Sequence, residues 1–370
     1  MVFSHLASDA RVLRQIRVLS TRFTVTSAAF GPSPIEGVEH VQLEDLPPYR
    51  GGQLSRLAYI AAFMLRMFPM LSRRNPRDRA AEAVLAGRGW DVVVANDVET
   101  IPLARRLAPR HGVHADVHEY ATRQNEHSLS WRWIMAPYYR WLVKSHLAAA
   151  TAVTTVSGGI AAEYLREFGI RADVVTNASA YQDLHPTKVA SPIRLVHSGA
   201  PAVQRKLEIM IDAVKMVDAD VTLDLFLLDD GSAYLASLKE RAAGESRIRF
   251  NDAVDSGELV KVLSGYDVGL SILPPTTFNL AWCLPNKFFD FIQARLGVIV
   301  GPSPEMQRVV EETGVGRVTE DFTVGALARV LEELDPSVIS EWKAASDRHA
   351  EELSAGPQGE VWVGVIQRML

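Results

Sequence analysis

The sequence predicts an α/β protein with two doubly wound, Rossmann-like domains that face a cleft. First, its 370 residues exceed the length at which a single hydrophobic core usually keeps growing. Second, short β-branched runs alternate with helical segments, and these runs are continuously apolar, as in parallel strands covered on both faces. Third, the periodicity stops at 177–192, where Asn, Ser, His and Pro replace regularly spaced hydrophobic residues.

The first half of the chain repeats strand and helix, so its strands should be joined by right-handed crossovers. We place this domain at residues 1–180. Its expected strands are 2–4, 23–30, 91–97, 112–120, 151–157 and 172–177, and its expected helices are 9–19, one through residue 103, 129–150 and 159–169.

The second half, residues 181–370, repeats the pattern, and its last helix is a candidate for packing back on the first domain. Its expected strands are 193–199, 222–230, 246–254 and 267–274, with helices between them, one starting at Arg205. The stretch "LPNKFFDFIQARLGVIVG" (284–301) predicts a helix followed by a buried strand, and segments 309–314 and 316–320 continue the array. Ligand sites of doubly wound domains lie at the carboxyl ends of their strands, so the cleft between the domains is the expected active site.

Composition narrows the class of protein. The chain is 48% hydrophobic and 22% charged, and no apolar run is long enough to span a bilayer. The N-terminus lacks the pattern of a secretory signal, so we expect a cytoplasmic protein. One cysteine, Cys283, excludes an internal disulfide and suits a packing role. Residues 1–185 carry a net charge of +4 and the rest −9, which argues against nucleic acid but leaves an anionic acceptor or membrane surface open.

Lys287 and Asp290 interrupt the apolar start of the helix in 284–301. At a spacing of three residues they project from one face of the helix, while Phe288, Phe291 and Ile292 can face a core. One interpretation is a solvated face with a weak ion pair.

The other interpretation is an anion site at the start of this helix, with a diphosphate as the expected anion. The strand 267–274 delivers the chain to a carboxyl edge, and Pro285 suits a first turn. The backbone N–H groups of residues 284–287 would then point into the cleft, together with the charge of Lys287. Asp290 could accept hydrogen bonds from sugar hydroxyl groups.

Three further residues are candidates for the site. His118 ends a strand at the carboxyl edge beside Glu119, although a structural histidine is the alternative. Arg205 and Lys206 stand at an expected helix start, where cations oppose the helix dipole unless an anion offsets them. We expect Arg205 and Lys287 to be exposed in the cleft. The chain contains neither a dinucleotide-binding glycine motif nor a Walker loop.

Taken together, these segments resemble the retaining GT-B glycosyltransferases, in particular the family 4-like enzymes that include many bacterial capsule and lipopolysaccharide transferases. Each motif is short, but five occur in the family's order over nearly the whole chain. They are "SDARVLRQIRVLS", "DVHEY", "TVSGGIAAEYLREFG", "LVHSGAPAVQRKLEIMIDAV" and "LPNKFFDFIQARLGVIVG".

The resemblance implies a role for each candidate residue. His118 would face the donor sugar, Gly199 would let the backbone approach the diphosphate, and the phosphates and ribose would be held by Arg205, Lys206, Asn286, Lys287 and Asp290. Of these, His118, Arg205 and Lys287 would be catalytic. The sequence departs from the family's pattern at four positions. Ala200 replaces a frequent arginine, Trp282 replaces the first of two acidic residues, Asp290 is a shorter acid at the second, and Asp229 stands where a glycine is usual.

The predicted function is retaining, metal-independent transfer of a sugar from a nucleoside-diphosphate sugar to a glycan, lipid-linked or small-molecule acceptor. The donor is a substrate, and no cofactor is expected. Asp218 and Asp220 spell a metal-binding pattern, but they precede the strand 222–230 and so should lie at the wrong edge of the sheet. A nucleotide-sugar epimerase of the same fold and a catalytically silent binding subunit remain alternatives.

The first domain also offers surfaces for an acceptor or a membrane. Segments 54–77 and 130–144 mix Leu, Met, Phe, Trp and Tyr with basic residues, as segments that lie in an anionic interface do. The same apolar faces could instead form an acceptor cleft or a dimer contact. The sequence leaves the donor base and sugar, the acceptor and the oligomeric state open.

Overall fold

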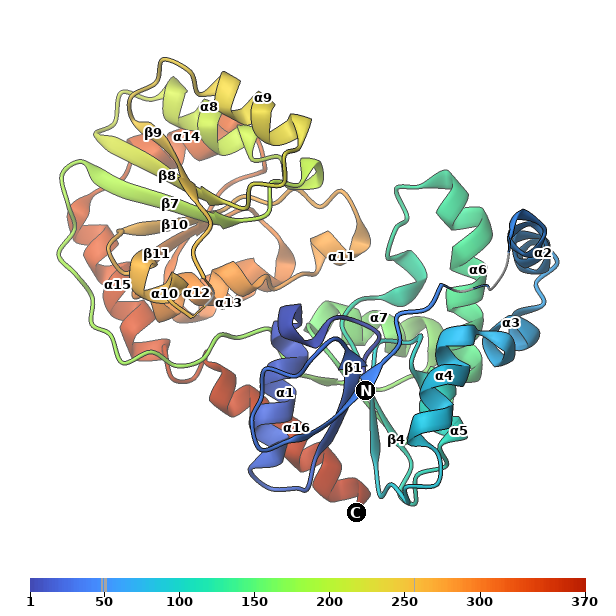
Figure 1. The fold of residues 1–370 in the computed structure, drawn as a ribbon. Helices are drawn as coiled ribbons and strands as arrows, with labels where there is room; N and C mark the ends of the chain where they lie inside the picture. Colours follow the sequence, from blue (N-terminus) through green and yellow to red (C-terminus); the bar gives the residue numbers. More distant parts are fainter. Residues whose placement is uncertain (48, 50–51, 256) are drawn as a thin grey trace. The chain divides into compact units, whose positions relative to one another are not determined.

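A computed structural model describes residues 1–47, 49, 52–255 and 257–370. The chain divides into two compact units, and each is an α/β unit with parallel strands (Figure 1). Unit 1 comprises Met1–Thr176, Thr277–Asn279 and Gln358–Leu370, and unit 2 comprises Asn177–Thr276 and Leu280–Pro357. The prediction of an α/β protein with two Rossmann-like domains is confirmed.

Unit 1 contains a two-stranded sheet, β1–β2, and a four-stranded sheet in the order β3-β4-β5-β6. Its strands are β1 (Thr26–Phe30), β2 (Glu39–Leu43), β3 (Val93–Asn96), β4 (Val113–Val117), β5 (Ala152–Thr155) and β6 (Asp173–Val174). Its helices are α1 (Ala10–Ser20), α2 (Gln53–Met64), α3 (Phe68–Arg74), α4 (Pro76–Leu85), α5 (Ile101–Arg106), α6 (Leu129–Ser145) and α7 (Gly158–Phe168), with most of α16 (Ala355–Met369).

The first expected strand, residues 2–4, is not a regular strand. Residues 1–5 nevertheless connect the two sheets of unit 1: Val2 N–H donates to Ala28 O of β1 (3.0 Å), and the Met1 amino group donates to Val94 O of β3 (2.8 Å). Residues 1–5 are too few and too irregular to form a continuous ladder of backbone hydrogen bonds with both β1 and β3. It still aligns β1 and β3 in one direction.

Unit 2 has a six-stranded sheet in the order β12-β11-β10-β7-β8-β9, and every pairing is parallel. Its strands are β7 (Ile193–Gly199), β8 (Val221–Leu227), β9 (Ile248–Asp252), β10 (Val268–Ser271), β11 (Gly297–Val300) and β12 (Gly316–Val318). Its helices are α8 (Glu208–Met216), α9 (Ala233–Arg241), α10 (Leu259–Leu263), α12 (Asn286–Gln293), α13 (Pro304–Thr313), α14 (Val324–Glu332) and α15 (Pro336–His349). The short helix α11 (Phe278–Ala281) lies where the two units meet in sequence.

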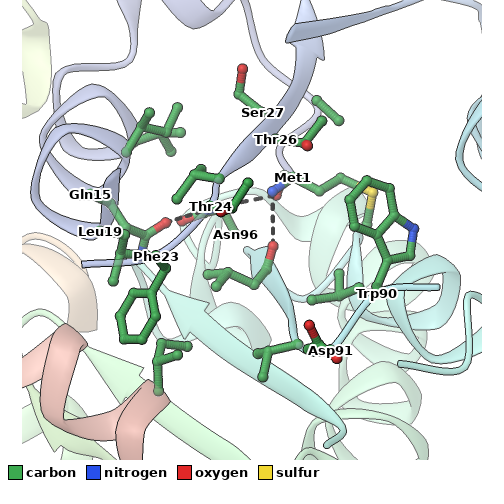
Figure 2. A pocket seen from close by; sticks show the side chains of 18 of the residues that line it. Met1, Gln15, Leu19, Phe23, Thr24, Thr26, Ser27, Trp90, Asp91 and Asn96 are labelled. Carbon is green, nitrogen blue, oxygen red and sulfur yellow. Dashed lines mark hydrogen bonds between the residues drawn. The ribbon is translucent and has the colours of Figure 1, made fainter. Parts of the chain in front are cut away.

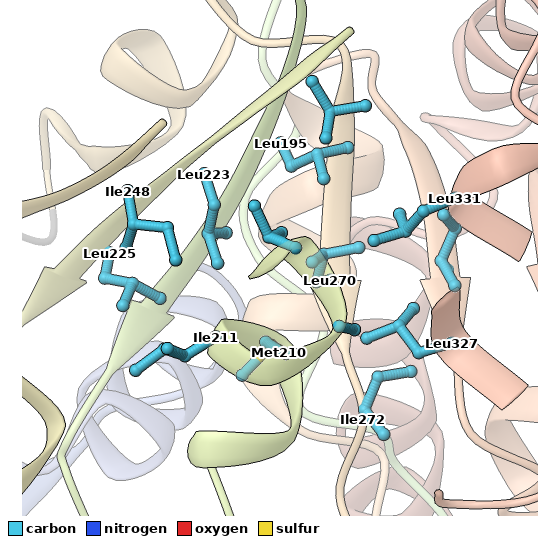
Figure 3. Close-up of a cluster of buried hydrophobic side chains, with 14 of the residues drawn as sticks. Leu195, Met210, Ile211, Leu223, Leu225, Ile248, Leu270, Ile272, Leu327 and Leu331 are labelled. Atoms are coloured by element: carbon cyan, nitrogen blue, oxygen red, sulfur yellow. The ribbon is translucent and has the colours of Figure 1, made fainter. Parts of the chain in front are cut away.

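The core of unit 2 forms between its sheet and the helices α8 and α14 (Figure 3). Met210 and Ile211 of α8 and Leu327 of α14 are fully buried against Leu223 and Leu270 of the strands. In a second buried cluster, Phe288 and Ile292 of α12 pack with Val196 and Val298 of the strands. The central strands are therefore covered on both faces, which explains their continuously apolar sequences.

Two helix boundaries differ from the sequence prediction. The helix expected from Arg205 begins at Glu208, because a short 3-10 turn (Val203–Arg205) ends at Lys206, whose φ of 51° is left-handed. The helix expected over 129–150 ends at Ser145 and is followed by a separate 3-10 turn, Leu147–Ala149. Both differences are changes of local backbone conformation that hydrophobic spacing does not reveal.

Candidate functional site

The topology of unit 2 places a switch point between β7 and β10. The chain runs outward from β7 through β8 to β9, then returns and runs outward on the other side from β10 through β11 to β12. The connections therefore leave β7 and β10 in opposite directions and open a crevice at their carboxyl ends, which is where doubly wound sheets bind ligands. Gly199 is the last residue of β7, and α12 follows β10.

Lys287 lies on the first turn of α12 and turns inward. It is buried, with 7% of its surface exposed, and its Nζ lies 3.0 Å from Nε2 of His197 on β7. The expectation of an exposed lysine is therefore wrong. Hydrophobic spacing identified the polar face of α12 but not the depth at which β7 and the following loop cover it.

The partner of Lys287 is a neutral imidazole. Nδ1 of His197 lies 2.8 Å from the carbonyl oxygen of Leu270, which can only accept, so the imidazole proton is on Nδ1 and Nε2 accepts from Lys287. Burial, and then the positive charge of Lys287, hold the pKa of His197 well below its usual value. Sequence reasoning missed His197 because it stands inside an apolar strand, "LVHSG", like a core residue.

Arg205 completes a cationic pair around Gly199. A Cβ built on Gly199 would lie 2.9 Å from Nζ of Lys287 and 3.0 Å from Nη1 of Arg205, and the φ of this glycine is +135°. Arg205 also donates to the carbonyl oxygen of Ala200 (3.2 Å). The backbone at Gly199 thus lies directly beside two cations, and a side chain there would be both strained and obstructed.

The electrostatics of this cluster favour an anionic ligand. Burial and the neighbouring Arg205 lower the pKa of Lys287 well below its ordinary value, and burial also lowers the pKa of Arg205. Two cations are therefore held together in a partly desolvated place where their charge is costly. A phosphate group bound beside Gly199 would offset that cost.

The other predicted residues of unit 2 lie close to this cluster or beside it. Asn286 is the exposed first residue of α12, and Asp290, one turn later, accepts a hydrogen bond from the Ser179 hydroxyl. Lys206 instead lies 3.7 Å from the carboxylate of Glu208. The structure therefore brings Lys287, Arg205 and Gly199 together and gives Lys206 an ion pair of its own.

Cys283 and the pair Asp218 and Asp220 were also singled out in the sequence. Cys283 is half-buried, burial raises the pKa of its thiol to about 11, and its thiol donates to Leu280 O (3.2 Å). Asp220 precedes β8 and accepts a hydrogen bond from the Ser191 hydroxyl (2.9 Å). Among the residues that the structure describes, no group of three His, Cys, Asp or Glu side chains is arranged to hold a metal ion.

In unit 1, His118 follows the last residue of β4, at the carboxyl edge of its sheet. Its main-chain N–H donates to Oδ1 of Asp97 (3.1 Å), and its Nε2 lies 3.3 Å from Oδ1 of Asn96. Its ring also lies 3.5 Å from the Asp97 carboxylate and 3.6 Å from that of Asp116. Burial alone would lower the pKa of His118, but these two carboxylates outweigh burial and raise it.

Asp97 adopts an uncommon backbone conformation to make these contacts. Its φ is 65°, in the left-handed region that a non-glycine residue enters at a cost of about 1 kcal/mol or more. Its N–H donates to Asp116 O (2.9 Å). The turn after β3 therefore places the Asp97 carboxylate against the main-chain N–H and the ring of His118.

A buried network connects α1 to the strand end that carries His118. Arg11 donates to both oxygens of Asp116, at 2.7 and 3.0 Å, and Gln15 donates to one of them at 3.0 Å. Asp116 is fully buried, and although burial raises its pKa, Arg11 and His118 bring it well below the ordinary value. The "DAR" and "DVHE" motifs are about a hundred residues apart in sequence, but their side chains form one buried hydrogen-bonded network.

A large cavity in unit 1 borders the buried network, because Gln15 and Asn96 line it. It has a volume of about 570 Å³ and lies near the amino ends of β1 and β3, with Thr24, Thr26, Trp90 and Asp91 in its wall (Figure 2). None of the predicted site residues lines it.

Comparisons with known proteins bear on the first domain and on the fold. Residues 9–178 match the model of the glycosyl transferase 4-like domain. No protein of curated function matches the sequence.

Solved structures with a similar fold span nearly the whole chain. Sucrose-phosphate synthase from Thermosynechococcus elongatus is 14% identical, with a TM-score of 0.71 over 96% of this chain and 92% of its own. A glycosyltransferase from Rickettsia africae is 11% identical, with a TM-score of 0.69 over 99% and 96%. Anabaena HepE in complex with UDP and glucose is 14% identical, with a TM-score of 0.69 over 99% and 98%.

The chain has the GT-B fold of these glycosyltransferase structures, and the domain match supports transferase activity. More particularly, residues 9–178 form a glycosyl transferase 4-like domain. The prediction of a family 4-like GT-B glycosyltransferase is thereby confirmed.

Proposed function

We propose that the protein transfers a sugar from a nucleoside-diphosphate sugar to an acceptor, with retention of configuration and without a metal ion. One observation carries the proposal: the Lys287 ammonium and the Arg205 guanidinium lie 2.9 and 3.0 Å from the place where Gly199 lacks a Cβ. Preorganised cations stabilise the negative charge that develops on a departing diphosphate, at about 2.7–4 kcal/mol for each good contact.

The donor is proposed to bind with its diphosphate at the carboxyl end of β7. The N-terminus of α12 adds backbone N–H groups there, and Asn286 at the start of the helix and Asp290 one turn later would meet the phosphates or the ribose. Because the similar Anabaena protein was solved with UDP and glucose, UDP-sugars are the first donors to test.

Retention and the role of His118 remain part of this proposal. In a front-face reaction the leaving phosphate oxygen takes the proton of the acceptor hydroxyl, so no pair of catalytic carboxylates is needed. His118, whose pKa is raised by two carboxylates, would donate a hydrogen bond to the donor sugar. The acceptor would be a glycan, a lipid-linked sugar or a small molecule, met in the cytoplasm or at the inner face of the membrane.

Turnover of a panel of nucleoside-diphosphate sugars tests the proposal. Arg205→Ala should lower transfer about tenfold or more through loss of a phosphate contact, whereas Arg249→Ala, an exposed arginine on β9, should leave it unchanged. Proton NMR of the first-formed product gives its anomeric configuration, and activity should persist in EDTA.

The two alternatives give different results in the same assay. An epimerase would convert one nucleotide sugar into another without an acceptor, and a silent binding subunit would bind the nucleotide without turning it over. An inverted product, or activity that EDTA abolishes and Mg²⁺ or Mn²⁺ restores, would contradict retention or metal independence.

A further inference from the structure

Helix α2 presents apolar side chains on two opposite faces. Its inner face packs into a cluster in which Ala62 and Phe63 contact Phe68 and Leu71, with Tyr138 of α6 against them. Its outer face repeats at spacings of three and four residues and is open: 62% of Leu57 and 68% of Met64 is exposed, and the same face carries Leu54 and Ala61.

This exposure is concentrated rather than scattered over the molecule. Of the 17 large hydrophobic side chains that are exposed in the described part of the chain, eight lie in residues 54–67 and 129–133. Two of these eight, Leu129 and Trp133, lie at the start of α6, which packs against α2. Single exposed hydrophobic residues are ordinary on a protein surface, but a group of this kind marks an interaction site.

The charge around this face identifies the kind of partner. Residues 52–77 contain five arginines and no aspartate or glutamate, and α6 adds Arg132, Arg140 and Lys144, also without an acidic residue. The whole chain carries a net charge of −5, so this region is strongly different from the rest. A second copy of the chain would bring the same positive charge to a shared interface, whereas an anionic surface would be attracted to it.

We propose that the outer face of α2 docks on an anionic lipid bilayer. The helix would lie in the plane of the interface, with Leu54, Leu57 and Met64 among the lipid chains and the arginines at the headgroups. Its 12 residues are about 18 Å long, which suits an interfacial helix. Among the described residues, no helix is long and apolar enough to cross a membrane. The proposal deepens the proposed function by assigning the membrane contact to one surface. The biological purpose of the contact rests on the proposed function, whereas the lipid binding itself does not.

Vesicle co-sedimentation of the full chain tests the proposal, with vesicles of phosphatidylcholine alone and of phosphatidylcholine mixed with phosphatidylglycerol. Binding should require phosphatidylglycerol and weaken as salt is added. The double variant Leu57→Gln, Met64→Gln should reduce bound protein about tenfold or more. Met216→Gln, at a side chain that is 62% exposed in unit 2, is the matched control and should bind like the original protein.

The arginines have their own variants. Arg56→Gln, Arg73→Gln and Arg74→Gln together should weaken binding about tenfold or more, and Arg348→Gln, an exposed arginine on α15, should not. Circular dichroism and a thermal melt verify that each variant is folded. Equal binding to both kinds of vesicle, or unchanged binding by both the double variant and the triple arginine variant, would overturn the proposal.

Two further measurements separate the alternatives. Sedimentation velocity without lipid should show the same oligomeric state for the original protein and the α2 variants; a dimer that the variants lose would assign this face to a second copy and overturn the lipid proposal. Hydrolysis of the donor without vesicles should be the same in the α2 variants and the original protein. If the original protein binds vesicles but turns over no nucleotide sugar, the proposed function fails while the lipid proposal stands.

Discussion

Replacement of Lys287 by methionine should separate ligand binding from stability. Lys287 is buried, and its Nζ donates to a neutral imidazole at 3.0 Å rather than to a carboxylate. Methionine removes a desolvated cation, which favours the fold, but leaves Nε2 of His197 without its donor, at a cost of about 1–3 kcal/mol. Because the two effects oppose each other, we expect the free energy of unfolding to change by less than about 2 kcal/mol.

The same substitution should strongly weaken binding of a nucleoside diphosphate. A hydrogen bond to a charged group contributes about 1.5–3 kcal/mol, which corresponds to a Kd about 12- to 150-fold higher. Isothermal titration with UDP, GDP and ADP measures this loss for whichever nucleotide binds the original protein. Denaturant unfolding without nucleotide measures the change in stability.

Lys343 provides a matched control in the same unit. It is also buried, with 1% exposed, but its Nζ donates to Tyr266 O (2.9 Å) and to the Thr187 hydroxyl (3.0 Å) and lies 3.5 Å from Asp267. Lys343→Met should therefore lower the free energy of unfolding by about 1.5–3 kcal/mol and leave the nucleotide Kd unchanged. If Lys287→Met destabilised the protein as much and bound the nucleotide normally, Lys287 would be a structural lysine and the phosphate site would lie elsewhere.

Four other predictions test the remaining parts of the site. His118→Ala should lower kcat about tenfold or more with a smaller change in donor KM, and normal turnover would make His118 a structural residue. Gly199→Ala should raise the nucleotide Kd about tenfold or more by titration, because its Cβ would lie 2.9 Å from a lysine Nζ at a φ of +135°; an unchanged Kd would argue against phosphate approach there. Since burial and Arg205 lower the pKa of Lys287 well below the ordinary 10.5, its charge is lost as pH rises through that lowered value; nucleotide affinity should therefore fall as pH rises at a pH well below 10.5, and a flat profile would contradict this. The double variant Asp218→Ala, Asp220→Ala should retain activity in EDTA, and loss of activity that Mg²⁺ restores would refute metal independence.

The sequence by itself determined the fold class and led to the prediction of an anion site at the start of α12. Continuous apolar strands fix parallel sheets covered on both faces, and β7 has the predicted bounds, Ile193–Gly199. Lys287 was identified because a helix start after a strand is a local pattern, readable from spacing, Pro285 and charge. Such features depend on residues close together in the chain.

Only the tertiary structure decided burial and long-range pairing. Periodicity assigned Lys287 to a face of α12 but predicted an exposed side chain, because spacing gives direction around a helix and not depth beneath neighbouring elements. His197 looked like a core residue until β7 and α12 placed its Nε2 3.0 Å from Lys287. Arg11 and Asp116 form an ion pair although they are 105 positions apart in sequence. The outer face of α2 can be recognised as an exposed surface only once the structure shows that the opposite face packs against α6. The physical reason is that desolvation, pKa shifts and open surfaces arise from packing between distant segments, which local sequence patterns do not specify.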